Sequence, residues 1–270
     1  MANDPTAIAQ ELQDAYAGGD MLDAPLSSRP GFDLTAAYAV AAELLRRRRA
    51  GGHASVGRKV AFANEAVWQK LNLKTVAWGE MYDDTVQHAS RTDKTSVPFT
   101  YAPKLEPEIV FRMKRSITGH FDDPAAVLRA VEWLSLGYEI VDCPFPEWRF
   151  QAADLVAAFG FHAGLVLGEP TMVTEANAAS LAAQLGTFKL KLFKNDVFVE
   201  EGGGHNVLRN PALALGEFAA ALSRSPWAEP LNAGELVSTG SLTTPMLIAP
   251  GESWRAEPDG LPVAPLTMNL

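Results

Sequence analysis

Apolar residues recur at helical spacing in several stretches of the chain, and these stretches predict amphipathic helices. In the first stretch Ile8, Leu12 and Tyr16 lie four residues apart, and Gly18-Gly19 follows as a stop signal. Later stretches begin with Asp or Asn, in two cases followed by proline, which is typical of a helix N-terminus. The predicted helices cover residues 5–17, 33–51, 64–71, 122–135, 175–184 and 210–222.

Shorter apolar segments bounded by Gly, Pro, Asn and Asp predict β-strands. Phe188, Leu190 and Leu192 alternate with lysines, so we expect a strand with one buried and one solvent-exposed face. Residues 194–196 predict a hairpin turn after it. The predicted strands cover residues 55–61, 108–113, 136–141, 163–167, 188–200 (the hairpin), 237–241 and 246–249. We therefore expect a single α+β domain over residues 1–270, with a mainly helical N-terminal part at 1–75 and a β-rich body at 76–270.

Composition narrows the classes of function. The chain has 270 residues, a formal net charge of -9 and one cysteine, Cys143. One cysteine excludes an internal disulfide and a thiolate metal cluster, and the acidic balance argues against a nucleic-acid partner. The N-terminus has no signal-peptide pattern, and no apolar run is long enough for a membrane span. We expect a cytoplasmic protein with no membrane partner.

Common nucleotide and hydrolase motifs are absent. The sequence contains no GxGxxG after a strand, no GxxxxGK[ST], no HExxH and no GxSxG. Gly202 to Gly204 has no phosphate-loop context, which favours a turn. The basic run Arg46–Arg49 lies at a predicted helix C-terminus, where cations complement the helix dipole, and a phosphate-binding patch is the alternative.

Two glutamates at alternate positions give the chain its most informative chemistry. Glu106 and Glu108 flank Pro107 at the start of an apolar strand, and residues i and i+2 of a strand share a face. A third carboxylate, Glu139, lies within another apolar strand. Nearby buried carboxylates repel one another unless a cation balances them. Oxygen ligands suit Mg²⁺ or Mn²⁺, so the three glutamates are a candidate metal site.

At this point the sequence resembles a known family, the 2-oxo-pent-4-enoate hydratase and 4-oxalocrotonate decarboxylase group of the fumarylacetoacetate hydrolase superfamily. The resemblance runs along most of the chain, from the N-terminal helices to Ala256. Individual segments are short, and their order and spacing make the resemblance specific. The matching segments are Val56–Val60 (VGRKV), Glu106-Pro107-Glu108 (E-x-E), Glu139, Trp148 with Gln151 and Asp154 (W-x-x-Q-x-x-D), and Ser238–Ser241 with Pro245-Met246.

The resemblance implies a mixed β roll of the fumarylacetoacetate hydrolase type, with an N-terminal helical part and flanking helices. It implies a divalent metal, Mg²⁺ or Mn²⁺, held by Glu106, Glu108 and Glu139. The implied small-molecule partner is a 2-oxo or 2-hydroxydienoate acid that chelates this metal. A homo-oligomer is also implied, and hydratases and decarboxylases of this family can associate with a partner enzyme of the same pathway.

Further site residues follow from the resemblance. Lys59 is the candidate for proton transfer or a substrate-oxygen contact, and we expect burial near a metal to lower its pKa. An ordinary surface lysine is the alternative. Asp154 and Gln151 are expected to orient water or the groups around the metal, and Thr239 to hold the substrate carboxylate. Asp84 falls in a segment that lines the pocket in this family.

One stretch departs from the family pattern. Where hydratases commonly read V-A-D-N-A-S, this chain has Val156 to Phe161, with Ala158, Phe159 and Phe161 in place of polar residues. We expect Phe159 and Phe161 to line a more apolar substrate pocket, which weakens the case for hydration. His162 is a candidate acid/base, and a structural histidine is the alternative.

Three functions remain open. The leading hypothesis is a metal-dependent hydratase that adds water to a 2-hydroxydienoate in the degradation of aromatic compounds. The second is a decarboxylase of a vinylogous 2-oxo diacid, since both reactions pass through an enolate. The third is a non-catalytic relative that binds metal or a partner.

Overall fold

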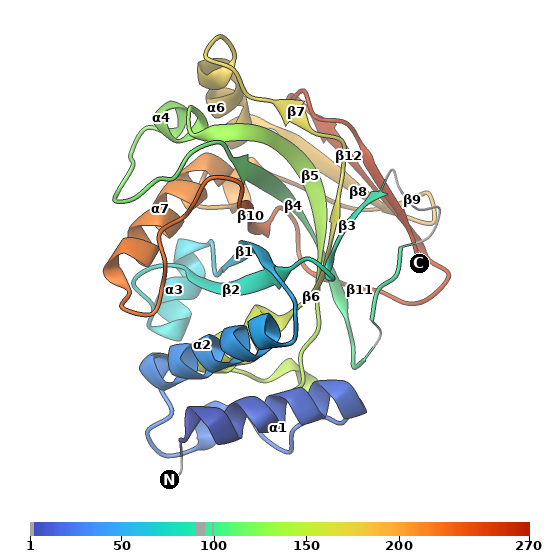
Figure 1. Cartoon of the computed structure of the whole chain (residues 1–270). Coiled ribbons are helices and arrows are strands. Elements are labelled where there is room, and N and C mark those ends of the chain that lie inside the picture. Colours follow the sequence, from blue (N-terminus) through green and yellow to red (C-terminus); the bar gives the residue numbers. More distant parts are fainter. Residues whose placement is uncertain (1–2, 90–94, 99) are drawn as a thin grey trace.

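The computed structural model describes residues 3–89, 95–98 and 100–270 (Figure 1). Its helices are α1 (Pro5–Gly18), α2 (Leu34–Ala50), α3 (Glu65–Leu71), α4 (Pro124–Leu128), α5 (Ala152–Ala157), α6 (Ala178–Thr187) and α7 (Pro211–Arg224). Short 3-10 turns are η1 (Leu26–Ser28), η3 (Pro146–Trp148), η4 (Phe159–Phe161) and η5 (Gly204–Asn206). The strands are β1 (Ser55–Ala61), β2 (Ala77–Tyr82), β3 (Val86–His88), β4 (Lys104–Met113), β5 (Val131–Val141), β6 (His162–Leu167), β7 (Thr171–Met172), β8 (Lys189–Lys194), β9 (Val197–Gly203), β10 (Leu236–Ser241), β11 (Met246–Leu247), β12 (Ser253–Asp259) and β13 (Leu266–Asn269).

A curled mixed sheet forms the centre of the molecule. Its strand order in the described residues is β2-β1-β10-β4-β5-β6-β3, with β11 added to β4 and β7 to β5. The pairs β1–β10 and β3–β6 are parallel, and the other pairs are antiparallel. The expected α+β class with a mixed sheet is confirmed. The long strand β5 arches over the centre of the view in Figure 1.

A second sheet, of order β13-β12-β8-β9, packs on the same core. The largest apolar cluster joins it to the main sheet and to α6 and α7, through residues such as Leu190, Leu185 and Phe218. In Figure 1, α4, α6 and α7 lie together beside the upper part of β4 and β5. The predicted hairpin is confirmed as β8 and β9, and its turn residues Asn195 and Asp196 have positive φ.

A separate apolar cluster holds the N-terminal helices. It joins α1, α2, α5 and η4 through buried residues that include Leu12, Val40, Leu155 and Phe161. Strand β1 belongs to the N-terminal 75 residues and lies inside the main sheet, between β2 and β10. The division of one domain at residue 75 stays a prediction.

Several helix boundaries follow the predicted capping residues. Asp33, Asn64 and Asn210 accept hydrogen bonds from backbone N–H groups in the first turns of α2, α3 and α7. These bonds satisfy donors that a helix N-terminus leaves unpaired. No helix among the residues that the structure describes is long and apolar enough to cross a membrane.

Two predicted helices are misplaced. The helix expected at 122–135 ends at Leu128, and residues from Val131 onward form the first part of β5. This part pairs with β4 as far as Met113, so cross-strand pairing overrides the local helix signal. The helix expected at 175–184 runs from Ala178 instead, after a turn closed by reciprocal bonds between Thr174 and Asn177.

Candidate active site

Strands β4 and β5 bring the three predicted glutamates together. Glu106 and Glu139 are direct cross-strand neighbours, and Glu108 lies two residues from Glu106 on the same face. One carboxylate oxygen of each residue lies within 4.8 Å of the others. Glu108 and Glu139 are fully buried, whereas Glu106 is partly exposed. The group of three, here called the carboxylate cluster, therefore opens to solvent on the Glu106 side.

Glu108 is held by strand β10. Its Oε2 accepts hydrogen bonds from the Ser238 hydroxyl at 2.6 Å and from the Gly240 backbone N–H at 2.8 Å. Gly240 has φ +114°, and a Cβ there would lie 2.7 Å from the Cβ of Ala63, so only glycine fits. The other oxygen, Oε1, is buried without a hydrogen-bond partner among the described residues. An unpartnered buried oxygen is costly unless a ligand engages it.

Glu139 has an ion-pair neighbour at Oε2, which makes no hydrogen bond among the described residues, and a hydrogen-bond partner at Oε1. Lys59 Nζ lies 3.0 Å from Oε2, and His162 Nδ1 lies 3.0 Å from Oε1. Lys59 reaches the cluster from β1 and His162 from the first position of β6. Both side chains are buried, so these contacts are not screened by bulk water.

Burial and mutual repulsion perturb the carboxyl groups. Burial, reinforced by the Glu139 charge, raises the pKa of Glu106 to about 7. The same causes raise the pKa of Glu108 well above its usual range. Burial acts against ionisation of Glu139 as well, but Lys59 and His162 outweigh it and hold its pKa below the usual value. The cluster therefore carries more negative charge than Lys59 balances when all three carboxylates are ionised.

The expected lowering of the Lys59 pKa concerns the metal-bound site and stays a prediction, whereas without a metal the pKa shifts upward. Burial alone would lower it, but the charges of Glu139, Glu106 and Glu108 outweigh burial and raise the pKa of Lys59. Arg58 points to the opposite side of β1, where it binds Glu235 through two nitrogens. Lys59 is thus a charged hydrogen-bond donor facing the carboxylate cluster.

Thr239 lies between the two β10 residues that contact Glu108, but it faces the other way. Its hydroxyl donates to the Ile109 carbonyl at 2.8 Å, and the residue is fully buried. Its substrate-binding role stays a prediction. Sequence reasoning missed Ser238 and Gly240, although strand alternation places them on the face opposite to that of Thr239.

Asp154 and Gln151 lie where α5 meets η1. Asp154 accepts hydrogen bonds from the Ser27 N–H at 2.7 Å, the Ser27 hydroxyl at 2.6 Å and the Gln151 N–H at 2.7 Å. Gln151 is exposed at the N-cap of α5. These bonds fasten α5 to the N-terminal region, and they do not join either residue to the carboxylate cluster. Their proposed roles in orienting water remain predictions.

Asp84 belongs to a different group of side chains. It lies in the exposed turn after β2, where it pairs with Arg48 and lies 3.3 Å from His53 Nδ1. Asp83 completes this surface group. Its partners are therefore surface residues, and its predicted place in the pocket lining stays untested.

The rings of Phe159 and Phe161 face the N-terminal helices and an aromatic cluster. Phe161 packs on Phe150 with ring centroids 4.9 Å apart, and Phe159 packs on Tyr16 at 5.4 Å. The group beside Lys59 is instead the backbone of Gly160, where a Cβ would lie 3.3 Å from Lys59 Cδ. The structure thus gives no support to the expectation that these two rings make the substrate pocket more apolar.

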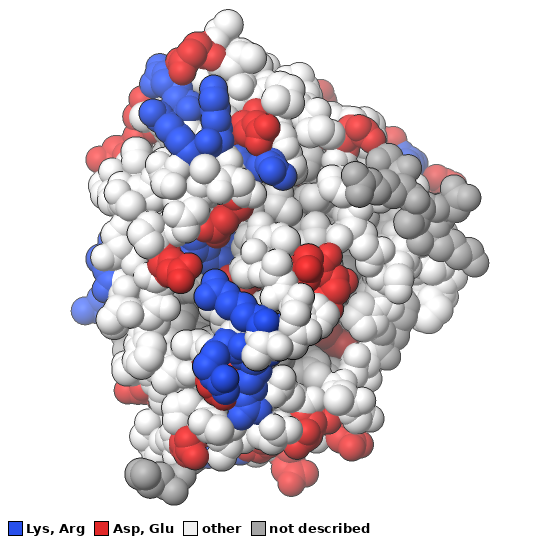
Figure 2. Space-filling view, in the orientation of Figure 1, with Lys and Arg blue, Asp and Glu red and all other residues white. Residues whose placement is uncertain are grey.

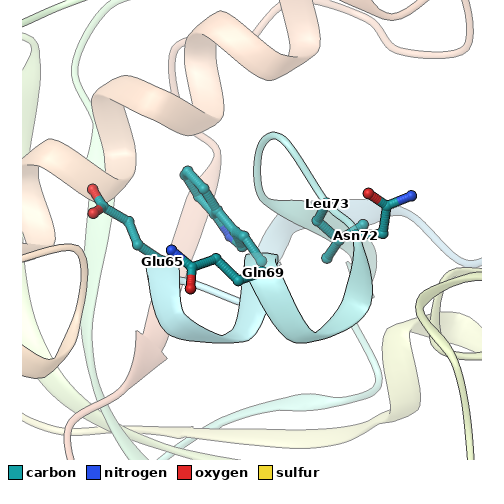
Figure 3. A pocket seen from close by; sticks show the side chains of 5 residues that line it. Glu65, Gln69, Asn72 and Leu73 are labelled. Atoms are coloured by element: carbon teal, nitrogen blue, oxygen red, sulfur yellow. The ribbon is translucent and has the colours of Figure 1, made fainter.

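The cavity shown in Figure 3 lies elsewhere. It has a volume of about 310 Å³ and is lined by residues of and next to α3: Glu65, Trp68, Gln69, Asn72 and Leu73. None of them belongs to the carboxylate cluster, whose chemistry is the stronger indication of a site. On the face seen in Figure 2, the blue Lys and Arg side chains gather in two groups, one at the upper left and one at and below the centre, with red Asp and Glu side chains beside each group.

Comparison with known proteins gives relatives of nearly full length. A 2-keto-4-pentenoate hydratase from Paraburkholderia xenovorans is 27% identical over 94% of this chain and 90% of its own length. A 2-hydroxyhexa-2,4-dienoate hydratase from Comamonas testosteroni is 26% identical, with 93% and 92% covered. A 4-oxalocrotonate decarboxylase from a Pseudomonas species is 27% identical, with 94% and 93% covered. No family model matches the chain.

Solved structures share the fold. A 4-oxalocrotonate decarboxylase from Pseudomonas putida, complexed with magnesium and adipate, superposes with a TM-score of 0.83 at 22% identity, with 98% of this chain and 96% of that chain covered. A fumarylpyruvate hydrolase from Pseudomonas aeruginosa, in complex with Mn²⁺ and pyruvate, gives 0.53 at 13% identity, with 78% and 87% covered. The predicted fumarylacetoacetate hydrolase type of fold is confirmed.

Proposed function

Since the chain is a relative of 2-keto-4-pentenoate hydratases and 4-oxalocrotonate decarboxylases over nearly its whole length, we propose that it is a metal-dependent lyase of 2-oxo or 2-hydroxydienoate acids. Its leading reaction is the addition of water to a 2-hydroxydienoate. The observation that carries this proposal is the carboxylate cluster, in which three carboxyl groups face the single charge of Lys59 and two of them have raised pKa values.

The cluster fits a hard divalent cation, Mg²⁺ or Mn²⁺. Glu106, Glu108 and Glu139 supply oxygen donors close to one another, and Glu108 Oε1 is buried without a partner among the described residues. When bound, the cation supplies Lewis-acid stabilisation of negative charge on the 2-oxo oxygen. Ser238 and Gly240 hold Glu108 in place for this role.

Lys59 acts on the substrate in this proposal. Its ammonium is buried, charged and fixed against Glu139, so it donates a hydrogen bond to a substrate oxygen and holds a proton next to the reacting carbon chain. The backbone of Gly160 lies beside the aliphatic part of Lys59, where a side chain in place of glycine would crowd the lysine. The partly exposed Glu106 marks the side from which a substrate enters.

One observation favours the decarboxylase as the second candidate. Lys104 lies two residues before Glu106 on the same face of β4, on the side where the cluster opens. Its Nζ lies 3.9 Å from the centre of the Trp148 ring, and its charge lowers the pKa of Glu106 against the effect of burial. A cation there suits the second carboxylate of a diacid.

Absorbance of a 2-hydroxydienoate, followed with and without Mg²⁺ or Mn²⁺, tests the proposal. Metal-dependent loss of the dienol band with a hydrated product supports the hydratase, and release of carbon dioxide from a 2-oxo diacid supports the decarboxylase. Lys104→Gln should reduce diacid turnover at least tenfold and leave the monoacid reaction unchanged. Metal binding without turnover of either acid would favour the non-catalytic alternative. Full activity in Glu106→Gln/Glu108→Gln would refute the metal mechanism.

The same family implies a homo-oligomer in the cytoplasm, acting near an enzyme of the same pathway. Size-exclusion chromatography with light scattering tests the oligomeric state. A monomer at micromolar concentration would contradict it.

A further inference from the structure

Glu139 is held by a chain of hydrogen bonds that leads away from the substrate side. His162 Nδ1 contacts Glu139 Oε1 at 3.0 Å, and His162 Nε2 contacts the Thr85 hydroxyl at 2.9 Å. The side chain of His162 is 1% exposed. Both ring nitrogens are therefore engaged inside the protein, and neither is free to reach a substrate.

Thr85 is itself fixed from several directions. Its hydroxyl lies 3.1 Å from the Tyr82 N–H and 3.0 Å from the Tyr82 carbonyl, and its own carbonyl accepts from the Leu165 N–H at 2.8 Å. Thr85 thus joins the end of β2 to β6, three residues beyond His162. An anchor of this kind gives the imidazole one orientation.

The direction of the hydrogen bond between His162 and Glu139 follows from the chemistry of the two groups. A carboxylate only accepts hydrogen bonds, so His162 must carry a hydrogen on Nδ1 and donate it to Glu139. Thr85 has a single hydroxyl hydrogen, and the contact with Nε2 forms whether Thr85 donates or accepts. The bond to Glu139 is the same in both arrangements.

We propose that His162 is a positioning residue, anchored by Thr85, which fixes Glu139 for metal binding and does not exchange protons with the substrate. The inference rests on the proposed function, and it reassigns the acid/base role that the sequence suggests for His162. Groups that orient metal ligands commonly change metal affinity by about 10- to 100-fold when removed.

Calorimetric titration with Mn²⁺ alone tests the proposal. His162→Ala should weaken Mn²⁺ binding at least tenfold, and Thr85→Val should weaken it severalfold. Thr85→Ser and His162→Asn, which keep a hydroxyl and a donor near Nδ1, should recover part of the loss. Because Thr85 acts through His162, the double variant should bind no more weakly than His162→Ala. His120→Ala, which removes an exposed histidine, should bind like wild type.

Activity at saturating Mn²⁺ separates positioning from proton transfer. A positioning role predicts that His162→Ala keeps the wild-type pH profile once metal is saturating. Wild-type Mn²⁺ affinity in His162→Ala, additive losses in the double variant, or loss of one limb of the pH profile would each overturn the positioning role. If His162→Ala fails to fold, the Thr85→Val and Thr85→Ser pair carries the test. Wild-type protein that binds no Mn²⁺ would overturn the proposed function as well.

Discussion

Replacement of Glu106 by Gln tests the electrostatic description of the site directly. Burial and the Glu139 charge raise the pKa of Glu106 from 4.5 to about 7. Between these pH values the folded protein keeps a proton that the unfolded chain releases, so metal-free wild type loses stability as the pH rises through this window. A shift of this size corresponds to about 3 kcal/mol above pH 7, an upper value because Glu106 is partly exposed.

Glutamine has nearly the same shape and cannot ionise. Without metal, Glu106→Gln should equal wild type in stability near pH 4.5 and exceed it by up to about 3 kcal/mol at pH 8. For a chain of this length the difference is about 6 °C in Tm. Thermal unfolding followed by circular dichroism, in the presence of a chelator, measures it. Excess Mn²⁺ should raise the Tm of wild type but not that of the variant.

A matched control is Glu175→Gln, whose side chain is 80% exposed. Its stability should stay within about 0.5 kcal/mol of wild type at both pH values. The electrostatic reasoning is refuted if the difference between Glu106→Gln and wild type does not grow between pH 4.5 and pH 8.

Three further changes probe neighbouring contacts. Lys59→Met should cut turnover at least about 100-fold while Mn²⁺ still binds. Kinetics measures the turnover and calorimetry the Mn²⁺ binding, and retained turnover would exclude a catalytic role for Lys59. Gly240→Ala should cost more than about 2 kcal/mol and weaken Mn²⁺ binding, whereas Gly119→Ala, with positive φ but open space, should leave Mn²⁺ affinity intact. Ser27→Ala removes a hydrogen bond to Asp154 and should lower the free energy of unfolding by about 1–3 kcal/mol, with unchanged Mn²⁺ affinity. A loss of turnover in the folded variant would support the predicted catalytic role of Asp154.

The carboxylate cluster could be predicted from the sequence because its geometry is mostly local. Strand alternation places Glu106 and Glu108 on one face, whatever the rest of the fold does. The position of Glu139 opposite Glu106 depends on strand register, which the sequence supplied only through the family resemblance. The sign of the Lys59 pKa shift depends on three carboxylates at once, so no single neighbour could reveal it.

Directions of side chains in irregular segments were harder to predict. Phe159 and Phe161 both have positive φ, an uncommon conformation for large side chains, and this turns their rings toward the N-terminal helices. The sequence suggests that Asp154 is a polar residue near the active site, but its hydrogen-bond partner Ser27 lies more than a hundred residues away in sequence. Such pairings depend on tertiary contacts that no local pattern encodes.

The pairing of Glu106 with Glu139 has a consequence for how the chain folds. Glu106 belongs to β4 and Glu139 to β5, which are consecutive strands with α4 between them, whereas Lys59 lies on the more distant β1 and Ser238 on β10. A local hairpin closes sooner than contacts between distant segments. We therefore expect the two carboxylates to meet before Lys59 reaches them, and like charges directly opposite each other oppose strand pairing. Acid or a divalent cation should therefore speed refolding, and the rate of folding should depend on the charge of the carboxylate cluster.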